Sequence, residues 1–405
     1  MKLGKPLYDP RSDPFAVYRI LGGALALAII WFSVDQLWRN WENPVSHDFI
    51  AFWGAAKLAI AGKSALAYDP AVLRKVQTAF AAFPEGMSLP FAYTPAFLLL
   101  VLPFGFIEYP AAIIVWVCLL AVVYVVALRR VAPRAGMLAI AFPPVFVNCI
   151  EGQNGFLTAA LFFAAIASLE RRPFVAGLFI GSLIFKPQMA VLFPLALLAG
   201  RQWRAITGAA VSSIAVLFLG FLSFGPATFM AWLGALPHFA SIAKDGTVGW
   251  IRLTSVYAAG RQAGLAAEPA LALHIAVFAA VSVQVWKIWR SNHDIGSKGA
   301  VLACATVLSS SYIFLYDQLV LIIAFFWLAT RKANPVVLAS LWCLPIVSLF
   351  QYAQFKHTGA VGPINFGPLV PIALLVMVRQ RLKAATESQS PEFPLMSEGI
   401  VSNKA

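Results

Sequence analysis

A single aspartate, Asp48, stands where a polar loop meets an aromatic segment, a position suited to acid–base chemistry. It lies in the sequence SHDFIAFWGAAKLAIAGKSALAYDP. Aspartate is a preferred N-cap residue, so one interpretation is a solvated cap for a helix over 49–61. A carboxylate beside His47 and Trp53 at a lipid interface is also suited to remove a proton from a substrate. We therefore predict that Asp48 is a general base.

A lysine, Lys186, lies in the middle of an apolar stretch, within IFKPQ. A lysine at membrane depth is costly, so it is functional, paired, or extended toward an interface. Pro187 breaks the helix and frees carbonyl groups that a cavity could use. Because a buried cation of this kind suits a phosphate, we predict that Lys186 binds one.

Two polar turns separate later apolar runs. The first is EGQNG, residues 151–155, where Gln153 and Asn154 each offer a donor and an acceptor. This pair suits hydroxyl groups, although a plain turn has the same composition. The second is SSSYIFLYDQ, which contains Tyr316 and Asp317. Asp317 could pair with a buried cation such as Lys186 or orient a substrate, and a hydrogen-bonded hinge explains the segment equally well.

Further cations lie in the later predicted loops: Lys244, Arg252, Lys356 and His357. Any of them could meet a lipid phosphate, although each alone is more often a solvated charge. The sequence contains no P-loop, no dinucleotide-binding glycine motif and no zinc-spaced set of His or Cys. We therefore predict no metal site and no cofactor, with a divalent metal possible but not indicated. A substrate delivered through the membrane fits this pattern.

The composition is that of a protein that crosses a bilayer many times. Of 405 residues, 60% are hydrophobic and 12% are charged, against about 25% charged in a soluble domain. The net charge of +13 comes from basic residues at the ends of apolar segments, as the positive-inside rule produces. This pattern indicates the lipid bilayer as a partner and argues against nucleic-acid binding.

The order of apolar and polar segments predicts an all-α polytopic protein with one membrane-embedded domain over 1–383. A cytoplasmic tail, 1–14, precedes a first span over 15–38. A first outer loop, 39–92, carries two amphipathic helices, the Asp48 helix and one from Pro70 to about Phe83. Gly62 is expected to end the first of them, and Asp69 followed by Pro70 is expected to start the second. Both are too short to span and are predicted to lie along the membrane surface.

The rest of the chain is predicted to contain eleven further apolar runs, a second polar loop over 225–268, and a disordered cytoplasmic tail over 384–405. The runs are 91–109, 110–128, 136–150, 156–169, 174–199, 204–224, 269–290, 299–313, 317–330, 334–352 and 363–380, the first of them broken by Pro95 and Pro103.

The positions of the arginines conflict with the simplest topology. If every run crossed once, twelve spans would place Arg129-Arg130 and Arg171-Arg172 outside. The conflict disappears if 91–109 dips in and returns, and if 174–199 breaks at Lys186-Pro187 into two half-length helices. Asp48, Lys186 and both polar turns then gather around one outward-facing cavity. We prefer this second topology.

The motifs resemble those of glycosyltransferase family 87. The matching pieces are the Asp48 segment, YTPAFLLLVLPF, EGQNGFLTAALFF, RRPFVAGLFIGSLIFKPQMAVLFPLALLAGRQWRA and SSSYIFLYDQLVL. The resemblance implies the GT-C fold, a bundle of about 10–13 transmembrane or half-membrane helices. Family members include mannosyltransferases that use polyprenyl-phosphate mannose. Some carry histidines in a late SP-x-SW-x-HH region, where this sequence has Tyr316 and Asp317.

The resemblance also implies a reaction. The acid of the first outer loop is taken as the family's catalytic base, and that position matches Asp48. A hexose, with mannose the first expectation, would pass with inversion from a polyprenyl-phosphate carrier to a hydroxyl of a lipid or glycan acceptor. The expected location is the bacterial inner membrane, with the active site facing the periplasm.

The residues expected at the site fall into two further groups. Lys186, Arg252 and Tyr316 are expected to bind the donor phosphate. Sugar and acceptor contacts are expected from His47, Trp53, Tyr93, Gln153, Asn154, Gln188 and Asp317.

Two other classes of protein stay open at this point. A polytopic transporter or lipid flippase would also have broken helices and a charge at the midplane, although no internal repeat is seen. A non-catalytic scaffold would not need an acid and a lysine at one cavity. The enzyme hypothesis requires that Asp48 and Lys186 lie on the same side of the membrane.

Overall fold

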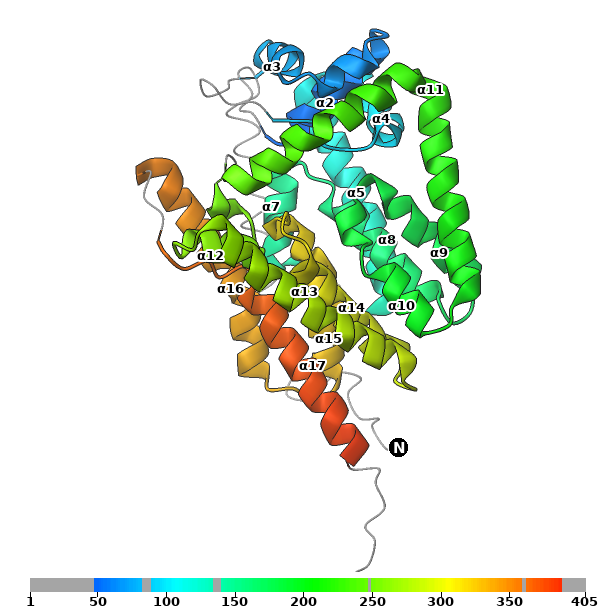
Figure 1. Cartoon of the computed structure of the whole chain (residues 1–405), viewed down its shortest axis with the longest axis vertical. Helices are drawn as coiled ribbons and strands as arrows, with labels where there is room; N and C mark the ends of the chain where they lie inside the picture. The colour runs from blue at the N-terminus through cyan, green and yellow to red at the C-terminus, as the bar shows by residue number, and fades with distance from the viewer. Residues whose placement is uncertain (1–46, 82–88, 134–139, 247–248, 359–361, 388–405) are drawn as a thin grey trace, which may run out of the picture.

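The structure is a computed structural model that describes residues 47–81, 89–133, 140–246, 249–358 and 362–387 (Figure 1). These residues form helices and contain no strand, which confirms the all-α polytopic class. Four helices in this part of the chain are long and apolar enough to cross a membrane: α5 (Tyr109–Val131), α11 (Trp203–Asp245), α13 (Ala267–Arg290) and α16 (Pro335–Thr358). The predicted tail 1–14 and first span 15–38 lie outside the described residues.

Shorter helices and 3₁₀ turns make up most of the remainder. They are α2 (Phe49–Ile60), α3 (Pro70–Thr78), α4 (Pro95–Val101), α7 (Pro143–Glu151), α8 (Gly155–Ser168), α9 (Pro173–Ser182), α10 (Phe193–Ala199), α12 (Val256–Gln262), α14 (Ile295–Ser309), α15 (Ile322–Thr330) and α17 (Leu369–Glu387), with turns η1 (Ser64–Tyr68), η2 (Leu102–Phe106), η3 (Leu183–Phe185), η4 (Pro187–Met189), η5 (Trp250–Arg252) and η6 (Leu315–Leu321).

The segment over 173–199 enters the bundle and returns, as the preferred topology requires. Helix α9 ends at Ser182, and Lys186 lies between η3 and η4, before α10. Helices α9 and α11 run parallel, with their backbones in contact. A Cβ on Gly177 would lie 2.1 Å from Ala205 O, and further along both helices a Cβ on Gly181 would lie 2.2 Å from Ala209 O. Since α9 and α11 start at the same end of the bundle, the chain between them must double back.

Helices α5 and α8 also run parallel. Trp116 in α5 donates to Gly152 O just before α8, and further along the ring of Tyr124 lies 5.9 Å from that of Phe163. Both arginine pairs therefore lie toward the same end of the bundle, Arg129-Arg130 in the last turn of α5 and Arg171-Arg172 shortly after the end of α8. The twelve-span arrangement would have placed both pairs on the outer side, with the Asp48 loop.

The segment over 91–109 begins and ends beside α2. The ring of Tyr93 lies 5.2 Å from that of Phe52 in α2, and Tyr109 OH accepts from the backbone amide of His47, just before α2, at 3.3 Å. Between these points α4 and η2 make a short helical excursion, and Gly105 of η2 is close enough to Ala56 that a Cβ would lie 3.0 Å from its side chain. The chain thus dips in and returns.

Helix α2 is buried inside the protein on nearly every face, and its position along the membrane surface stays a prediction. Nine of its twelve residues are buried. Its rings meet aromatic side chains from several elements: Phe49 lies 5.8 Å from Trp116, Phe52 lies 5.3 Å from Phe97, and Trp53 lies 5.7 Å from Tyr109. The helix is apolar on nearly every face, so burying all of it removes more apolar surface than lying at an interface would.

The ends of α2 and α3 follow the predicted local signals. Gly62 has a φ of +72° after the end of α2, and Asp69 accepts from the amides of Ala71 and Val72 at the start of α3. Helix α3 is amphipathic, with Leu73 buried, but it ends at Thr78 rather than near Phe83.

The second predicted loop begins as a helix instead. Helix α11 bends at Gly225, whose φ of +73° and ψ of +173° are not helical, and Pro226 follows. Residues 226–245, which we call the arch, continue as helix and cross over α2 and α4 (Figure 1). Ser64 in η1 and Thr228 in the arch are joined by a 2.8 Å hydrogen bond. The prediction of a polar loop over 225–268 is therefore wrong for 225–245, where Gly and Pro mark a bend and not an end.

The start of the predicted disordered tail is also helical. Helix α17 continues to Glu387, so residues 384–387 belong to it. Residues 388–405 lie outside the described part of the chain.

Candidate functional site

One cavity of about 490 Å³ lies beneath the arch. Asp48 and Lys186 both line it, so they face the same space. Polar lining residues come from segments far apart in the sequence: Asp48, Tyr93, Thr94, Gln153, Lys186, Gln188, Arg252, Ser310, Ser311, Tyr312 and Tyr316. The arch contributes an apolar roof of Trp232, Leu236, Phe239, Ala240 and Ile242.

The carboxylate of Asp48 faces this cavity and does not cap α2. Asp48 itself has helical backbone angles, φ −57° and ψ −26°, and its side chain makes no capping bond. Instead Oδ2 accepts from Gln153 Nε2 at 2.9 Å, and Arg252 Nη2 lies 3.2 Å from Oδ1 and 3.3 Å from Oδ2. The interpretation of Asp48 as a solvated cap is therefore wrong.

Arg252 forms the ion pair with Asp48 from η5. Its guanidinium carbon lies 5.8 Å from the centre of the Phe314 ring and 5.4 Å from that of Tyr352. Burial alone would lower the pKa of Arg252. The nearby carboxylates of Asp48 and Glu151 raise this pKa, and the net shift is upward. Arg252 is thus a permanent positive charge beside Asp48.

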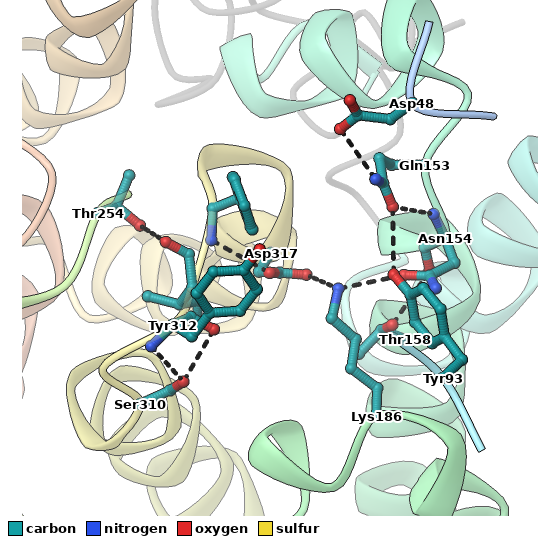
Figure 2. Close-up of polar contacts among 12 residues, drawn as sticks. Asp48, Tyr93, Gln153, Asn154, Thr158, Lys186, Thr254, Ser310, Tyr312 and Asp317 are labelled. Atoms are coloured by element: carbon teal, nitrogen blue, oxygen red, sulfur yellow. Dashed lines mark hydrogen bonds and ion pairs between the residues drawn. The ribbon is translucent and has the colours of Figure 1, made fainter. Parts of the chain in front are cut away.

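The EGQNG turn holds the centre of the site. Gly152 adopts a left-handed conformation with a φ of +60°, and a Cβ there would lie 2.7 Å from Phe49 Cβ. After this bend Gln153 reaches Asp48, and its Oε1 lies 3.5 Å from Tyr93 OH and 3.4 Å from the amide of Asn154. Figure 2 shows these contacts continuing from Gln153 to Asn154 and on to Lys186.

Lys186 is buried and paired. Its Nζ lies 2.5 Å from Asp317 Oδ1 and 3.1 Å from Asn154 Oδ1, and it sits 5.0 Å from the centre of the Tyr316 ring. Asp317 Oδ2 also accepts from the amide of Phe314 at 3.2 Å. The predicted pairing of Asp317 with Lys186 is confirmed, and extension toward an interface is excluded because Lys186 is only 3% exposed.

Most of the residues expected at the site meet in or next to this cavity. Tyr93, Gln153, Gln188, Arg252 and Tyr316 line it with Asp48 and Lys186, whereas Asn154 and Asp317 lie behind Lys186. Two do not reach it. Trp53 is buried, and its indole donates to Ile107 O at 2.9 Å. His47 does not line the cavity either, and its amide donates to Tyr109.

Some polar residues in the cavity or beside it were not on the predicted list. Thr94 and Tyr312 line it, and Glu151 accepts from the amide of Asp48 at 3.3 Å. All three lie within motifs that the sequence analysis recognised. The motifs pointed to these segments, but nothing in the sequence marked these three side chains as site residues. Lys244 is exposed at the end of the arch, and the side chains of Lys356 and His357 lie outside the described part.

Within the described residues no three His, Cys, Asp or Glu side chains are grouped in a way that could hold a metal ion. At Asp48 the guanidinium of Arg252 already contacts both carboxylate oxygens.

An all-helical membrane bundle with a carboxylate and cations in one deep cavity is the architecture of a membrane enzyme or a transporter. The model of glycosyltransferase family 87 matches residues 91–311, which is more than half of the chain. The chain belongs to glycosyltransferase family 87 and is a membrane glycosyltransferase. No curated protein and no solved structure matches it. The family match decides for the enzyme over the transporter, flippase and scaffold.

Proposed function

We propose that this protein transfers a hexose, mannose in the first instance, from a polyprenyl-phosphate carrier to a hydroxyl of a lipid or glycan acceptor. The observation that carries the proposal is the single cavity lined by Asp48, Arg252 and Lys186 beneath an apolar roof. Asp48, Arg252 and Lys186 offer a base and the cations that a phosphate needs, and the apolar roof formed by the arch offers a surface for a lipid.

Asp48 acts as the base in a single displacement. Its carboxylate takes the proton of the acceptor hydroxyl as that oxygen bonds to the anomeric carbon. The bond from the anomeric carbon to the phosphate oxygen breaks, and polyprenyl phosphate leaves with the electron pair. Attack opposite to the leaving group inverts the anomeric configuration. The phosphate is a good leaving group, so the step needs no general acid.

Arg252 and Lys186 offset the charge that the departing phosphate gains. The phosphodiester of the donor has one negative charge, and the released monoester gains a second. Fixed cations in a cavity shielded from water stabilise such developing charge strongly. Lys186 is held in place by Asp317 and Asn154, so its position does not have to be established during the reaction. Tyr316, below Lys186, completes this side of the site.

The arch supports a donor that arrives through the bilayer. No Asp, Glu, Lys or Arg occurs between Arg204 and Lys244. Met230 and Leu233 are exposed on the outside of the arch, while Trp232 and Phe239 face the cavity. A helix that is apolar on both sides suits the hydrocarbon region rather than water, so a polyprenyl chain could pass beneath it without leaving lipid.

The arginine pairs support an outward-facing site. Arg129-Arg130 lie in the last turn of α5 and Arg171-Arg172 follow α8, and the starting ends of both helices lie beside Asp48. By the positive-inside rule the arginine end faces the cytoplasm. In a bacterial inner membrane the Asp48 end would then face the periplasm.

The test is transfer by the purified protein in liposomes. Polyprenyl-phosphate mannose is supplied with a panel of lipid and glycan acceptors, and wild type is compared with Asp48→Asn. The substitution is expected to lower kcat by about 10²–10⁴-fold, because it removes the base and preserves the shape of the residue. Asp69→Asn is the matched control, since asparagine also caps α3 and Asp69 lies outside the cavity.

Each outcome separates a different part of the proposal. Equal transfer by wild type and a folded Asp48→Asn would keep the donor and remove Asp48 from the centre of the mechanism. No wild-type transfer from mannose, followed by transfer from another polyprenyl-phosphate hexose, would change only the sugar. No transfer from any lipid-linked hexose would refute the proposed donor class.

A further inference from the structure

A second acid, Glu151, holds the backbone of Asp48. Its Oε2 accepts from the Asp48 amide at 3.3 Å, across 103 residues of sequence. Glu151 is the last residue of α7 and is half-buried. It does not line the cavity, whereas Asp48 does. Its carboxylate therefore contacts the base residue without facing the space that a substrate would occupy.

The start of α2 explains why such a contact is needed. The first amides of a helix have no partner within the helix, and an aspartate at this position usually supplies one from its own side chain. Asp48 does not, because its carboxylate is held by Gln153 and Arg252. The amides of Ile50 and Ala51 donate to the carbonyls of His47 and Asp48 instead, and the amide of Asp48 itself donates to Glu151.

The turn after Glu151 is fixed in place. Gly152 has a φ of +60°, and its packing against Phe49 leaves no room for a Cβ. Its carbonyl accepts from Trp116 Nε1 at 2.9 Å. Glu151 and Gln153 flank this glycine, so one rigid turn holds the backbone of Asp48 on one side and its carboxylate on the other.

We propose that Glu151 is a positioning residue, which holds the backbone of Asp48 at the start of α2 and so fixes the place from which the Asp48 carboxylate faces the cavity. The inference rests on the proposed function, because it assigns Glu151 a part in orienting the base. It is the reach of the side-chain oxygen that matters, and not its charge. A displacement of the base by about 1 Å is enough to slow a reaction by about 100-fold.

Two conservative variants separate reach from charge. Glu151→Gln keeps an acceptor oxygen at the same distance and loses the charge. Glu151→Asp keeps the charge and shortens the side chain by one methylene. We expect Glu151→Gln to keep kcat within about threefold and Glu151→Asp to lose about tenfold or more, with the donor KM unchanged in both. The exposed Glu108, at the same end of the bundle, supplies the matched pair of control variants.

Hydrogen exchange supplies a readout that does not depend on activity. Exchange at the Asp48 amide is expected to be roughly tenfold faster in Glu151→Asp and unchanged in Glu151→Gln, because only the first loses the acceptor. A wild type that transfers no lipid-linked sugar would refute the proposed function, and this exchange measurement would still decide the positioning role. Equal kcat in the two variants, or a larger loss in Glu151→Gln, would overturn the inference.

Discussion

Gln153 and Asn154 are adjacent in the chain, yet one holds the acid of the site and the other holds its buried lysine. Gln153 donates to Asp48 at 2.9 Å, and Asn154 accepts from Lys186 at 3.1 Å. The distance between these two charged groups is therefore set by a single turn. Gly152 fixes that turn, since it adopts a left-handed conformation against Phe49.

Replacing Gln153 with leucine should slow the reaction and leave the fold intact. The substitution keeps the volume and removes the donor that orients the Asp48 carboxylate. We expect kcat to fall by about tenfold with little change in the donor KM, because a hydrogen bond to a charged group is worth about 1.5–3 kcal/mol. Steady-state transfer kinetics measure this. Gln202→Leu, outside the cavity, is the control, and an unchanged kcat in Gln153→Leu would contradict the role of Gln153.

Removing the charge of Lys186 should destabilise the protein as well as inactivate it. Lys186→Met leaves Asp317 buried without its cation, which typically costs about 3–5 kcal/mol. Thermal unfolding in detergent measures the loss. In the double variant Lys186→Met/Asp317→Leu, we expect stability to recover and activity to stay low. Recovery of activity in the double variant would show that Lys186 has only a structural role.

An alanine at Gly152 should be far more damaging than an alanine at Gly62. Both glycines have positive φ, so both variants incur the backbone strain of about 1–2 kcal/mol. Only at Gly152 would the new Cβ meet other atoms, 2.7 Å from Phe49 Cβ, whereas nothing lies within 4 Å at Gly62. The difference in melting temperature isolates the clash. Equal melting temperatures would mean that the turn can shift.

The arch should set the response to the length of the lipid chain. Phe239→Ala removes a ring that lines the cavity. We expect the donor KM to rise by about 5- to 30-fold with a long polyprenyl chain, since a deleted apolar side chain is worth about 1–2 kcal/mol of contact. With a short-chain donor the rise should be smaller. Met230→Ala, on the exposed side of the arch, is the control, and the same KM change for both chain lengths would argue against a lipid path here.

Chelators should leave the reaction unaffected. Arg252 contacts both oxygens of Asp48 and supplies the positive charge that a divalent ion would otherwise provide there. Transfer measured with EDTA, and again after adding Mg²⁺ or Mn²⁺, is expected to differ by less than about twofold. A requirement for an added metal would mean that Arg252 leaves Asp48 during the reaction.

Much of the architecture was readable from local chemistry. The Asp69-Pro70 pair predicted the start of α3, Gly62 predicted the end of α2, and Lys186-Pro187 predicted the break in the segment over 173–199. The arginine pairs predicted that this segment and 91–109 turn back. Each of these signals depends on backbone dihedral angles or on the cost of moving a charge across lipid, and both are properties of a few neighbouring residues.

Only the tertiary structure decided what those elements do together. Asp48 looks like a helix cap in the sequence, and its carboxylate turns to the cavity because Gln153 and Arg252 offer stronger partners than its own helix does. Trp53 and Phe49 look like an interfacial face and are buried, because α5 and η2 cover them. The residues after Gly225 look like a loop and form the arch. A sequence states what each side chain prefers, whereas these outcomes depend on which distant groups arrive beside it, and that is determined by the packing of the whole bundle.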